Sequence, residues 1–325
     1  MEINGFRIES IPELKSPILI AGFDGWGNAM DVSTETVLFF IKECNARAFA
    51  RLDPDLFYRY DASRPVVNIE AGTMKHFIPP GGTFYAAPTP PRSNDLLLFR
   101  AEEPNLNWNR FAAGLISLCN TLSVSTIITL GSMYGSVLPS DRIISGIASQ
   151  AEHREELNIR GMVPISYQGP SAVHSLIHVE AGKAGISSIS LWCHCPYYLQ
   201  GTTHFGILSN LVRLLSSITL VDVDTSEIDE RWEKLDIQIR ELIDDSPELQ
   251  KMISDIRKEK VRGTWASLER TGAGRNVIDI RDFFIPDKSG DQVLGIRYLI
   301  FAILDFGFGF WNKVSGVSHC VPGQQ

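Results

Sequence analysis

Several polar side chains follow apolar runs of the sequence at the points where those runs end. The runs are Ser16–Phe23, Ser125–Gly131 and Ile186–Trp192, each short and apolar enough to form a buried strand. The carboxyl ends of parallel strands are where α/β proteins bind ligands, and the free N–H groups of the helices that follow attract anions. We therefore predict a ligand pocket built from residues at strand ends and at one helix start, namely Asp24, Gly25, Ser132, Tyr134, Ser171 and Tyr198.

Each of these residues also has a purely structural interpretation. Ser and Asp commonly cap helices and turns, so Asp24, Ser132 and Ser171 could serve only that purpose. An anion beside Asp24 is disfavoured by the charge of that residue, and Trp26 is interpreted as a packing or interface residue. A nucleophilic serine needs a histidine base and an orienting carboxylate, and the sequence contains no Gly-x-Ser-x-Gly elbow. We predict no catalytic residue and leave enzymatic activity open, leaning against it.

Two groups of residues carry metal-binding atom types, but their spacing is poor for a metal. Cys193-His194-Cys195 could form a metal cluster with His204. In an extended strand, however, Cys193 and Cys195 share a face while His194 points away, and structural zinc usually takes better-separated ligand pairs. His174 and His178 share a helix face, but no third ligand is evident. We favour buried thiols and a polar helix side, and predict no metal and no cofactor. The carboxylates of Glu102-Glu103 would point apart in an extended chain, so this pair is interpreted as a solvated loop.

Composition narrows the class of protein. The chain has 325 residues, 44% of them hydrophobic, and a formal net charge of −8. This balance argues against a nucleic-acid binder, which normally presents a basic face. The five cysteines are odd in number and irregularly spaced, which suits a reducing compartment better than a disulfide framework. The first residues contain no apolar signal-peptide core, so we expect a cytoplasmic protein.

The elements that must position the predicted pocket follow an α/β order. Strand-like runs alternate with helical patterns over 30–45, 107–122, 170–184 and 203–217. We predict a mostly parallel, twisted sheet flanked by helices. Residues 47–92 contain strand-like pieces, including 57–60, divided by Pro and Gly, and are predicted to form a β-hairpin excursion. Residues 132–168 are expected to be mostly loop, with an irregular strand or two.

The C-terminal third divides into two parts. Ser226–Lys260 carries apolar residues at helical spacing and is broken at Asp245–Glu248, which predicts a helical hairpin whose second helix is capped by Ser246. We therefore divide the chain into a core domain 1–220, a hairpin appendage 221–265 and an extension 266–325. Within the extension, residues 293–311 are nearly as apolar as a membrane span but contain Arg297 and Asp305. A helix buried at an interface is the favoured interpretation; a membrane-proximal anchor and a poorly ordered extension are the alternatives.

Several motifs, in order, resemble those of the PAC2 family. They are Gly22–Asn28 (GFDGWGN), Leu52–Tyr60 (LDPDLFYRY) with Arg64-Pro65, Leu97–Trp108 (LLFRAEEPNLNW), Leu130–Gly135 (LGSMYG), Tyr167–Ser171 (YQGPS) and Gly185–Tyr198 (GISSISLWCHCPYY). The resemblance spans about residues 15 to 260. Relatives often carry histidines where this chain has Leu138–Arg142 and Pro196-Tyr197-Tyr198, and docking chaperones tend to end in a hydrophobic-Tyr-X tail, whereas this sequence ends Val321–Gln325.

The resemblance implies a phosphorylase-like or hydrolase-like α/β domain followed by a helical hairpin, and it implies oligomer formation. It also implies the role of an assembly chaperone or binding scaffold without established catalysis, acting on a protein partner. The alternative function is a binding protein or enzyme for a small molecule, such as a nucleoside or a phosphate-bearing compound, held at the strand ends.

Overall fold

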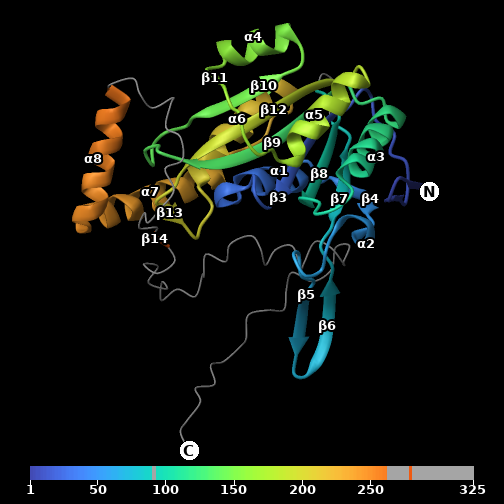
Figure 1. Cartoon of the computed structure of the whole chain (residues 1–325), viewed down its shortest axis with the longest axis horizontal. Coiled ribbons are helices and arrows are strands. Elements are labelled where there is room, and N and C mark those ends of the chain that lie inside the picture. Colours follow the sequence, from blue (N-terminus) through green and yellow to red (C-terminus); the bar gives the residue numbers. More distant parts are fainter. Residues whose placement is uncertain (90–92, 262–277, 280–325) are drawn as a thin grey trace, which may run out of the picture. The chain divides into compact units, whose positions relative to one another are not determined.

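A ten-stranded mixed sheet forms the centre of the computed structural model, which describes residues 1–89, 93–261 and 278–279 (Figure 1). Its central strands run parallel in the order β8 (Leu96–Glu102), β3 (Ile18–Asp24), β9 (Thr126–Gly135) and β12 (Ser187–Pro196). In β3 every residue but the last is buried, because helices cover both faces of the sheet there. The predicted α/β class with a parallel centre is confirmed.

Antiparallel strands extend the sheet on both sides of this centre. Beyond β8 come β7 (Gly82–Ala87), β4 (Arg47–Leu52), β2 (Phe6–Ile8) and β1 (Glu2–Ile3), each antiparallel to its neighbour. Beyond β12 come β10 (Ile144–Ala148), which is antiparallel to it, and β11 (Val163–Pro164), which is parallel to β10. The parallel order of β8, β3, β9 and β12 brings their carboxyl ends to one edge.

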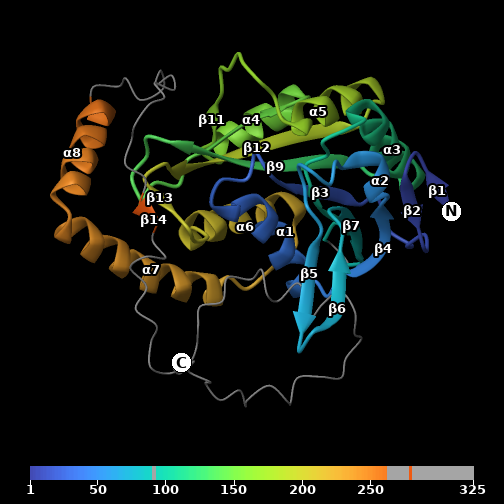
Figure 2. The ribbon, with the colours of Figure 1, turned by 60° about the horizontal axis from the view of Figure 1, so that its bottom comes forward.

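Helices cover both faces of the sheet (Figure 2). On one side lie α1 (Val32–Glu43), which follows a short 3-10 turn η1 (Ala29–Asp31), and α6 (Phe205–Thr219). On the other side lie α3 (Trp108–Thr121) and α5 (Val173–Lys183). Apolar residues spaced three or four apart, such as Phe111, Leu115 and Leu118 in α3, turn one stripe of each helix toward the sheet.

Six phenylalanines pack together in the part of the core that lies between the sheet, α3 and the short helix α2 (Pro54–Phe57). Phe84 of β7 and Phe99 of β8 are cross-strand partners whose rings stack 3.9 Å apart. Phe6, Phe23, Phe57 and Phe111 surround this pair at centroid separations of 5.6 to 6.1 Å. Such tilted and edge-on contacts stabilise a core beyond simple area burial, so this end of the sheet is a rigid base.

Two predicted appendages are present. The β-hairpin excursion consists of β5 (Val66–Glu70) and β6 (Thr73–Ile78), which form a two-stranded sheet of their own and project from the body (Figures 1 and 2). The helical hairpin consists of α7 (Ser226–Asp245), which packs on α6, and α8 (Pro247–Val261). The hydroxyl of Ser246 accepts a hydrogen bond from the Leu249 N–H at 3.3 Å, as the predicted cap requires.

Some local predictions were wrong. Residues 57–60 do not form a strand, because Phe57 ends α2. Residues 132–168 contain the strands β10 and β11, in keeping with the expected irregular strand or two, but they also contain the end of β9 and the helix α4 (Ala151–Ile159), where loop was expected. α5 begins at Val173, three residues after the expected start at Pro170.

The last elements are the short parallel pair β13 (Leu199–Gln200) and β14 (Ile278–Asp279). Within the described residues no helix combines the length and the apolar character that a membrane crossing requires. The apolar stretch 293–311 lies outside the described residues.

Candidate functional site

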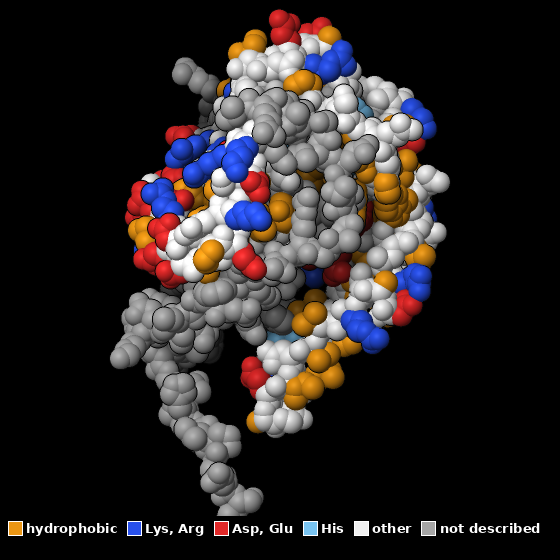
Figure 3. All heavy atoms as spheres, turned by 60° about the vertical axis from the view of Figure 1, so that its left-hand side comes forward, with side chains coloured by type: hydrophobic (Ala, Val, Ile, Leu, Met, Phe, Trp, Pro, Cys, Tyr) orange, Lys and Arg blue, Asp and Glu red, His pale blue; other side chains and the backbone are white. Residues whose placement is uncertain are grey.

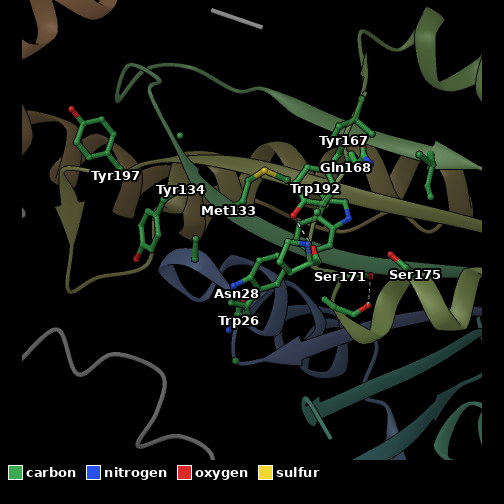
Figure 4. Close-up of a pocket in the computed structure, with 18 of the residues that line it drawn as sticks. Trp26, Asn28, Met133, Tyr134, Tyr167, Gln168, Ser171, Ser175, Trp192 and Tyr197 are labelled. Atoms are coloured by element: carbon green, nitrogen blue, oxygen red, sulfur yellow. Dashed lines mark hydrogen bonds between the residues drawn. The ribbon is translucent and has the colours of Figure 1, made fainter. Parts of the chain in front are cut away.

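A cleft of about 1180 Å³ opens at the carboxyl ends of β3, β9 and β12, and is called here the strand-end cleft (Figure 4). The loop after β3, the end of β9, the loop before α5 and single residues of β10 and β12 contribute to it. Its lining residues are Gly25, Trp26, Asn28, Ala29, Met133, Tyr134, Gly135, Ser136, Ile147, Ile165, Tyr167, Gln168, Gly169, Pro170, Ser171, Ala172, Ser175, Trp192 and Tyr197. In Figure 4 Tyr134 and Tyr197 lie at one end, Ser171 and Ser175 at the other, and Trp192 between them.

The residues predicted from the sequence divide into two groups. Gly25, Tyr134 and Ser171 line the strand-end cleft. The other three predicted residues do not line it. Asp24 precedes the lining at Gly25, and its carboxylate accepts hydrogen bonds from the Gly25 N–H and the Asn28 amide at 2.9 and 3.1 Å.

Ser132 and Tyr198 are buried and directed to backbone carbonyls rather than to the cleft. The Ser132 hydroxyl donates to the Ala29 carbonyl at 2.8 Å, and the Tyr198 hydroxyl donates to the Val137 carbonyl at 2.8 Å. Burial raises the pKa of the Tyr198 phenol far above its usual value. Both hydroxyls therefore hold the loops around the cleft in place.

Asn28 fixes the conformation of the loop between β3 and α1. Its amide group donates to Asp24 and to the Thr34 hydroxyl, at 3.1 and 2.9 Å, while its carbonyl oxygen accepts from the N–H groups of Ser33 and Thr34. The Asn28 backbone also bridges to Ser132. Because both the NH2 group and the carbonyl oxygen of this buried side chain are hydrogen-bonded, they fix the conformation of the loop that forms this wall of the cleft.

Trp192 forms the middle of the cleft, and two glycines make room for it. A Cβ at Gly131 would lie 2.7 Å from the indole, and one at Gly27 would lie 3.1 Å from it. The His174 ring packs on the indole from a third side at a centroid distance of 4.9 Å, and the indole N–H donates to the Ser190 hydroxyl at 3.1 Å. The indole therefore packs closely on two residues that lack a side chain, and the side chains of His174 and Ser190 hold it further.

His174 is a buried, neutral packing residue. One ring nitrogen lies 2.8 Å from the Leu130 carbonyl, to which it must donate, and burial lowers the pKa of the imidazole to about 4. The other predicted partner, His178, bonds instead to the Ser188 hydroxyl at 2.9 Å. The two histidines therefore have separate partners, and the interpretation of a polar helix side is wrong for His174, which packs in the core against Phe23 and Trp192.

Glu103 occupies the N-terminus of α5. Its carboxylate accepts a hydrogen bond from the Val173 N–H at 2.8 Å, and its own N–H donates to the Asp24 carbonyl at 2.8 Å. Glu102 is the last residue of β8 and both side chains are half-buried, so the interpretation of this pair as a solvated loop was wrong. This burial raises the pKa of both carboxyl groups. The protein's own carboxylate thus fills the helix start at which the sequence suggested anion binding.

The remaining hydroxyl–imidazole contacts do not form a catalytic triad. Ser145 bonds to His194 at 2.8 Å and Ser187 to His153 at 2.9 Å, but Ser145 and Ser187 are both buried. The Cys193 and Cys195 thiols are fully buried, and burial raises the pKa of Cys193 to about 12. Over the part of the chain that is described, no three His, Cys, Asp or Glu side chains gather as metal ligands would.

A second candidate site is the hairpin of β5 and β6, whose strands expose one apolar face. Cross-strand partners share a face, and the pairs Val67–Phe77 and Ile69–Met74 alternate with the polar pairs Asn68–His76 and Glu70–Thr73. These apolar side chains are between 46% and 59% exposed. Figure 3 shows hydrophobic side chains gathered on this projection, while acidic and basic ones are spread over α7 and α8. The four side chains Val67, Ile69, Met74 and Phe77 are called here the hairpin face.

Fold and site together define an α/β protein with a neutral aromatic cleft and an apolar projection, and comparison with known proteins gives its family. The model of the PAC2 family matches residues 19–243, and the chain belongs to that family. The resemblance predicted from the sequence motifs is therefore confirmed. Comparison with curated proteins gives no match.

Solved structures of the same fold come from bacteria and archaea. A proteasome-assembly chaperone homologue of Mycobacterium tuberculosis is 23% identical with a TM-score of 0.66, over 73% of this chain and 99% of the other. A protein of unknown function from Corynebacterium glutamicum is 16% identical with a TM-score of 0.73, over 79% and 97% of the two chains. An archaeal proteasome activator of Pyrococcus furiosus is 16% identical with a TM-score of 0.58, over 73% and 97%.

Proposed function

We propose that this PAC2-family chain works by binding protein, as an oligomeric scaffold of the assembly-chaperone kind, rather than by covalent catalysis. The observation that carries this proposal is the hairpin face. An isolated two-stranded hairpin is marginally stable in water, and contiguous exposed apolar side chains mark interaction surfaces. The names of the mycobacterial and Pyrococcus neighbours, a proteasome-assembly chaperone homologue and a proteasome activator, support a role within a larger assembly.

The occupant we propose for the hairpin face is a second copy of this chain. Its four side chains are uncharged, so two copies packed face to face bring no like charges together, although the whole chain carries a net charge of −8. Two packed hairpins supply four strands around a shared apolar layer, which meets the minimum for a stable small sheet assembly. Such a contact is isologous and closes on itself.

Sedimentation velocity of the full chain over a range of concentrations tests this proposal. The unaltered protein is expected to sediment as an oligomer, and the double variant Ile69→Ser/Phe77→Ser as a monomer. A matched control, Ile159→Ser/Val179→Ser, removes apolar side chains that are 81% and 50% exposed elsewhere and should sediment like the unaltered protein. A monomer throughout, or an unchanged oligomer in the hairpin variant, contradicts the proposal.

The strand-end cleft favours ligand binding as a second candidate function. Its volume is of the size that small-molecule sites reach, and its lining is aromatic with few polar groups. Tyr134 and Trp192 offer rings on which a planar group can stack. A phosphate is disfavoured, because the Glu103 carboxylate already caps α5 and Asp24 adjoins the same wall. A thermal-shift comparison of nucleosides with the corresponding nucleotides tests this candidate. A shift by nucleotides alone would contradict the argument against phosphate, and no shift by either class would contradict ligand binding of this kind.

A further inference from the structure

Three arginines cross one end of the central sheet on the face that is turned away from the phenylalanine core. Arg7 of β2 is the direct cross-strand partner of Arg51 of β4. Arg51 is in turn opposite Thr83 of β7, and Thr83 is opposite Arg100 of β8. Direct cross-strand partners share a face of the sheet, so these side chains point to the same side, and the three arginines are called here the arginine row. The residues that flank them in sequence belong to the core on the other face: Phe6, Leu52, Phe84 and Phe99.

The arginine row is open to solvent at its outer end. The side chains of Arg7 and Arg51 are 64% and 50% exposed, whereas Arg100 is half-buried. In Figure 2 the strands β2, β4 and β7 lie beyond α1, the helix that packs on β3 and β8. The row therefore begins on an accessible part of the sheet and ends beside α1.

The carboxylates of the protein neutralise this row only in part. Arg7 is paired with Asp53 at 2.7 Å. Arg51 lies 3.6 Å from Glu9, which is 64% exposed, and such exposed pairs are weak enough to exchange. Over the described part of the chain Arg100 is in no ion pair, and its Nε is buried without a hydrogen-bond partner.

Glu102 does not supply the missing partner, although it lies two residues beyond Arg100 on the same face of β8. Burial raises the pKa of the Glu102 carboxyl, and the charge of Arg100 is the smallest of the influences on it. Arg100 is therefore left without a close carboxylate among the described residues.

Tyr85 shows that the positive charges of the row act on the same place. It follows Thr83 by two residues and shares its face of β7. Burial raises the pKa of the Tyr85 phenol, and the charges of Arg100 and Arg51 both oppose that shift. Like charges placed opposite each other destabilise a sheet, as Arg7 and Arg51 are here. An anionic partner would remove this cost.

We propose that the arginine row binds an extended acidic segment of a partner protein. Guanidinium groups present paired N–H donors that match a carboxylate. Arg7 and Arg100 are three strand spacings apart, about 14 Å, and three alternate carboxylates of an extended chain, about 6.8 Å apart on one face, cover the same distance. A nucleic acid is disfavoured because the whole chain carries a net charge of −8.

This inference rests on the protein-binding function proposed above and names the chemistry of the partner. The surface is distinct from the hairpin face, which lies on the separate two-stranded sheet of β5 and β6.

Fluorescence anisotropy with labelled peptides tests the proposal. The probe Ser-Glu-Ser-Glu-Ser-Glu-Ser is compared with the same peptide carrying Gln for Glu, and with Ser-Ser-Glu-Glu-Glu-Ser-Ser, whose adjacent carboxylates cannot all share one face. The alternating probe is expected to bind about tenfold more tightly than the Gln peptide, the size of three exposed ion pairs, and more tightly than the adjacent one. Equal binding of the Glu and Gln probes, or binding of neither, overturns the proposal. Tighter binding of a thymidylate oligonucleotide overturns the choice of a protein partner.

Two variants assign the binding to the row. Arg51→Gln/Arg100→Gln should abolish the tenfold preference, whereas the control Lys251→Gln/Arg257→Gln, which removes the same charge from exposed positions of α8, should keep it. Arg51→Lys/Arg100→Lys keeps the charge without the paired donors and should retain at most about threefold. A full preference in either row variant overturns the proposal, and the charge-keeping variant carries the test if the other does not fold.

The hairpin variant Ile69→Ser/Phe77→Ser separates this inference from self-association. Its arginine row is intact, so it should bind the alternating probe as tightly as the unaltered chain does. Loss of probe binding in this variant overturns the assignment to the row. Failure of the row variants to change probe binding, with self-association confirmed, overturns this inference alone, whereas probe binding by a protein that is monomeric throughout supports it and contradicts only the oligomer.

Discussion

At the scale of single residues, buried imidazoles make the fold sensitive to acid. His174 packs under Trp192, and His204 stacks on Trp232 at 4.6 Å while its ring accepts from the Ile207 N–H. Burial lowers the pKa of His174 to about 4 and that of His204 to about 3, whereas an unfolded histidine titrates near 6.5. The unfolded chain therefore binds more protons than the native state at every pH between these values.

The sign of the pH dependence follows from this difference. The stabilisation is complete above the unfolded pKa and is lost as the pH falls toward the folded pKa. From pH 7 to pH 5 we expect a loss of about 2 kcal/mol in the free energy of unfolding from each of the two histidines. Urea denaturation at pH 7, 6 and 5 measures the free energy of unfolding at each pH. In the variant His174→Gln this free energy should depend less steeply on pH. Stability that does not change between pH 7 and 5 would contradict the prediction.

The residue types at the cleft could be predicted, but their depth could not. Tyr134 and Ser132 stand two apart on β9 and share a face, yet Tyr134 lines the cleft while Ser132 lies one step deeper, under the loop at Ala29. Trp192 was missed because in the sequence it is one more apolar residue of a buried strand. The available signal was the pair Gly27 and Gly131, since a missing Cβ marks a close approach.

At the scale of elements, α7 packs on α6, and an aromatic contact adds a further attachment to the body. The Trp232 ring stacks on His204, which begins α6, and the Arg142 guanidinium lies 4.3 Å from the ring centroid. The Lys260–Asp141 ion pair at 2.7 Å holds the end of α8 to the same loop. The helical hairpin thus has two attachments near residues 139–142.

Removing the aromatic attachment should therefore be costly. Trp232→Ala is expected to lower the free energy of unfolding by about 2–3 kcal/mol, below the range for a fully buried Trp because this ring is half-buried. The control Ile237→Ala on the same helix, at a position 57% exposed, should change it by less than about 0.5 kcal/mol. Guanidinium denaturation compares the two. Equal effects of both substitutions would show that Trp232 does not attach α7.

Elements with a strong apolar period were predictable, whereas those defined by tertiary contacts were not. The α7–α8 hairpin and its Ser246 cap follow from local sequence alone. The helix α4 was not predicted because its sequence is polar and only one of its residues, Leu157, is buried. The start of α5 was misplaced because its first N–H is satisfied by Glu103, seventy residues earlier in the chain, and no local pattern contains that partner.

At the scale of the whole molecule, the projecting hairpin is separable from the sheet. Its strands pair with each other and form a sheet distinct from the central one. Val66 and Ile78 are cross-strand partners, so their backbones are close enough to be joined by a short Gly-Ser linker. Replacing residues 66–78 in this way is expected to leave Tm within about 4 °C, a change of no more than about 1 kcal/mol, while abolishing self-association.

Calorimetry and sedimentation velocity check the two halves of that prediction independently. A large fall in Tm would show that the hairpin supports the core, and retained self-association would place the interface elsewhere. The fold class itself was predictable, because strands buried on both faces require helices on both sides. The antiparallel strands at the edges of the sheet were harder to predict, because β1 and β2 are only two and three residues long and show little hydrophobic periodicity.

The seating of Trp192 between Gly27 and Gly131 has a consequence for how this surface can evolve. A methyl group at Gly131 would lie 2.7 Å from the indole and collides with it, and one at Gly27 would lie 3.1 Å away and press on it. A smaller residue at 192 leaves both glycines facing a void. A replacement at Gly131 or Trp192 alone is therefore not neutral, whereas a joint replacement can restore contact. In relatives whose cleft binds a ligand of different shape, the residues at positions 27, 131 and 192 should therefore have been substituted together.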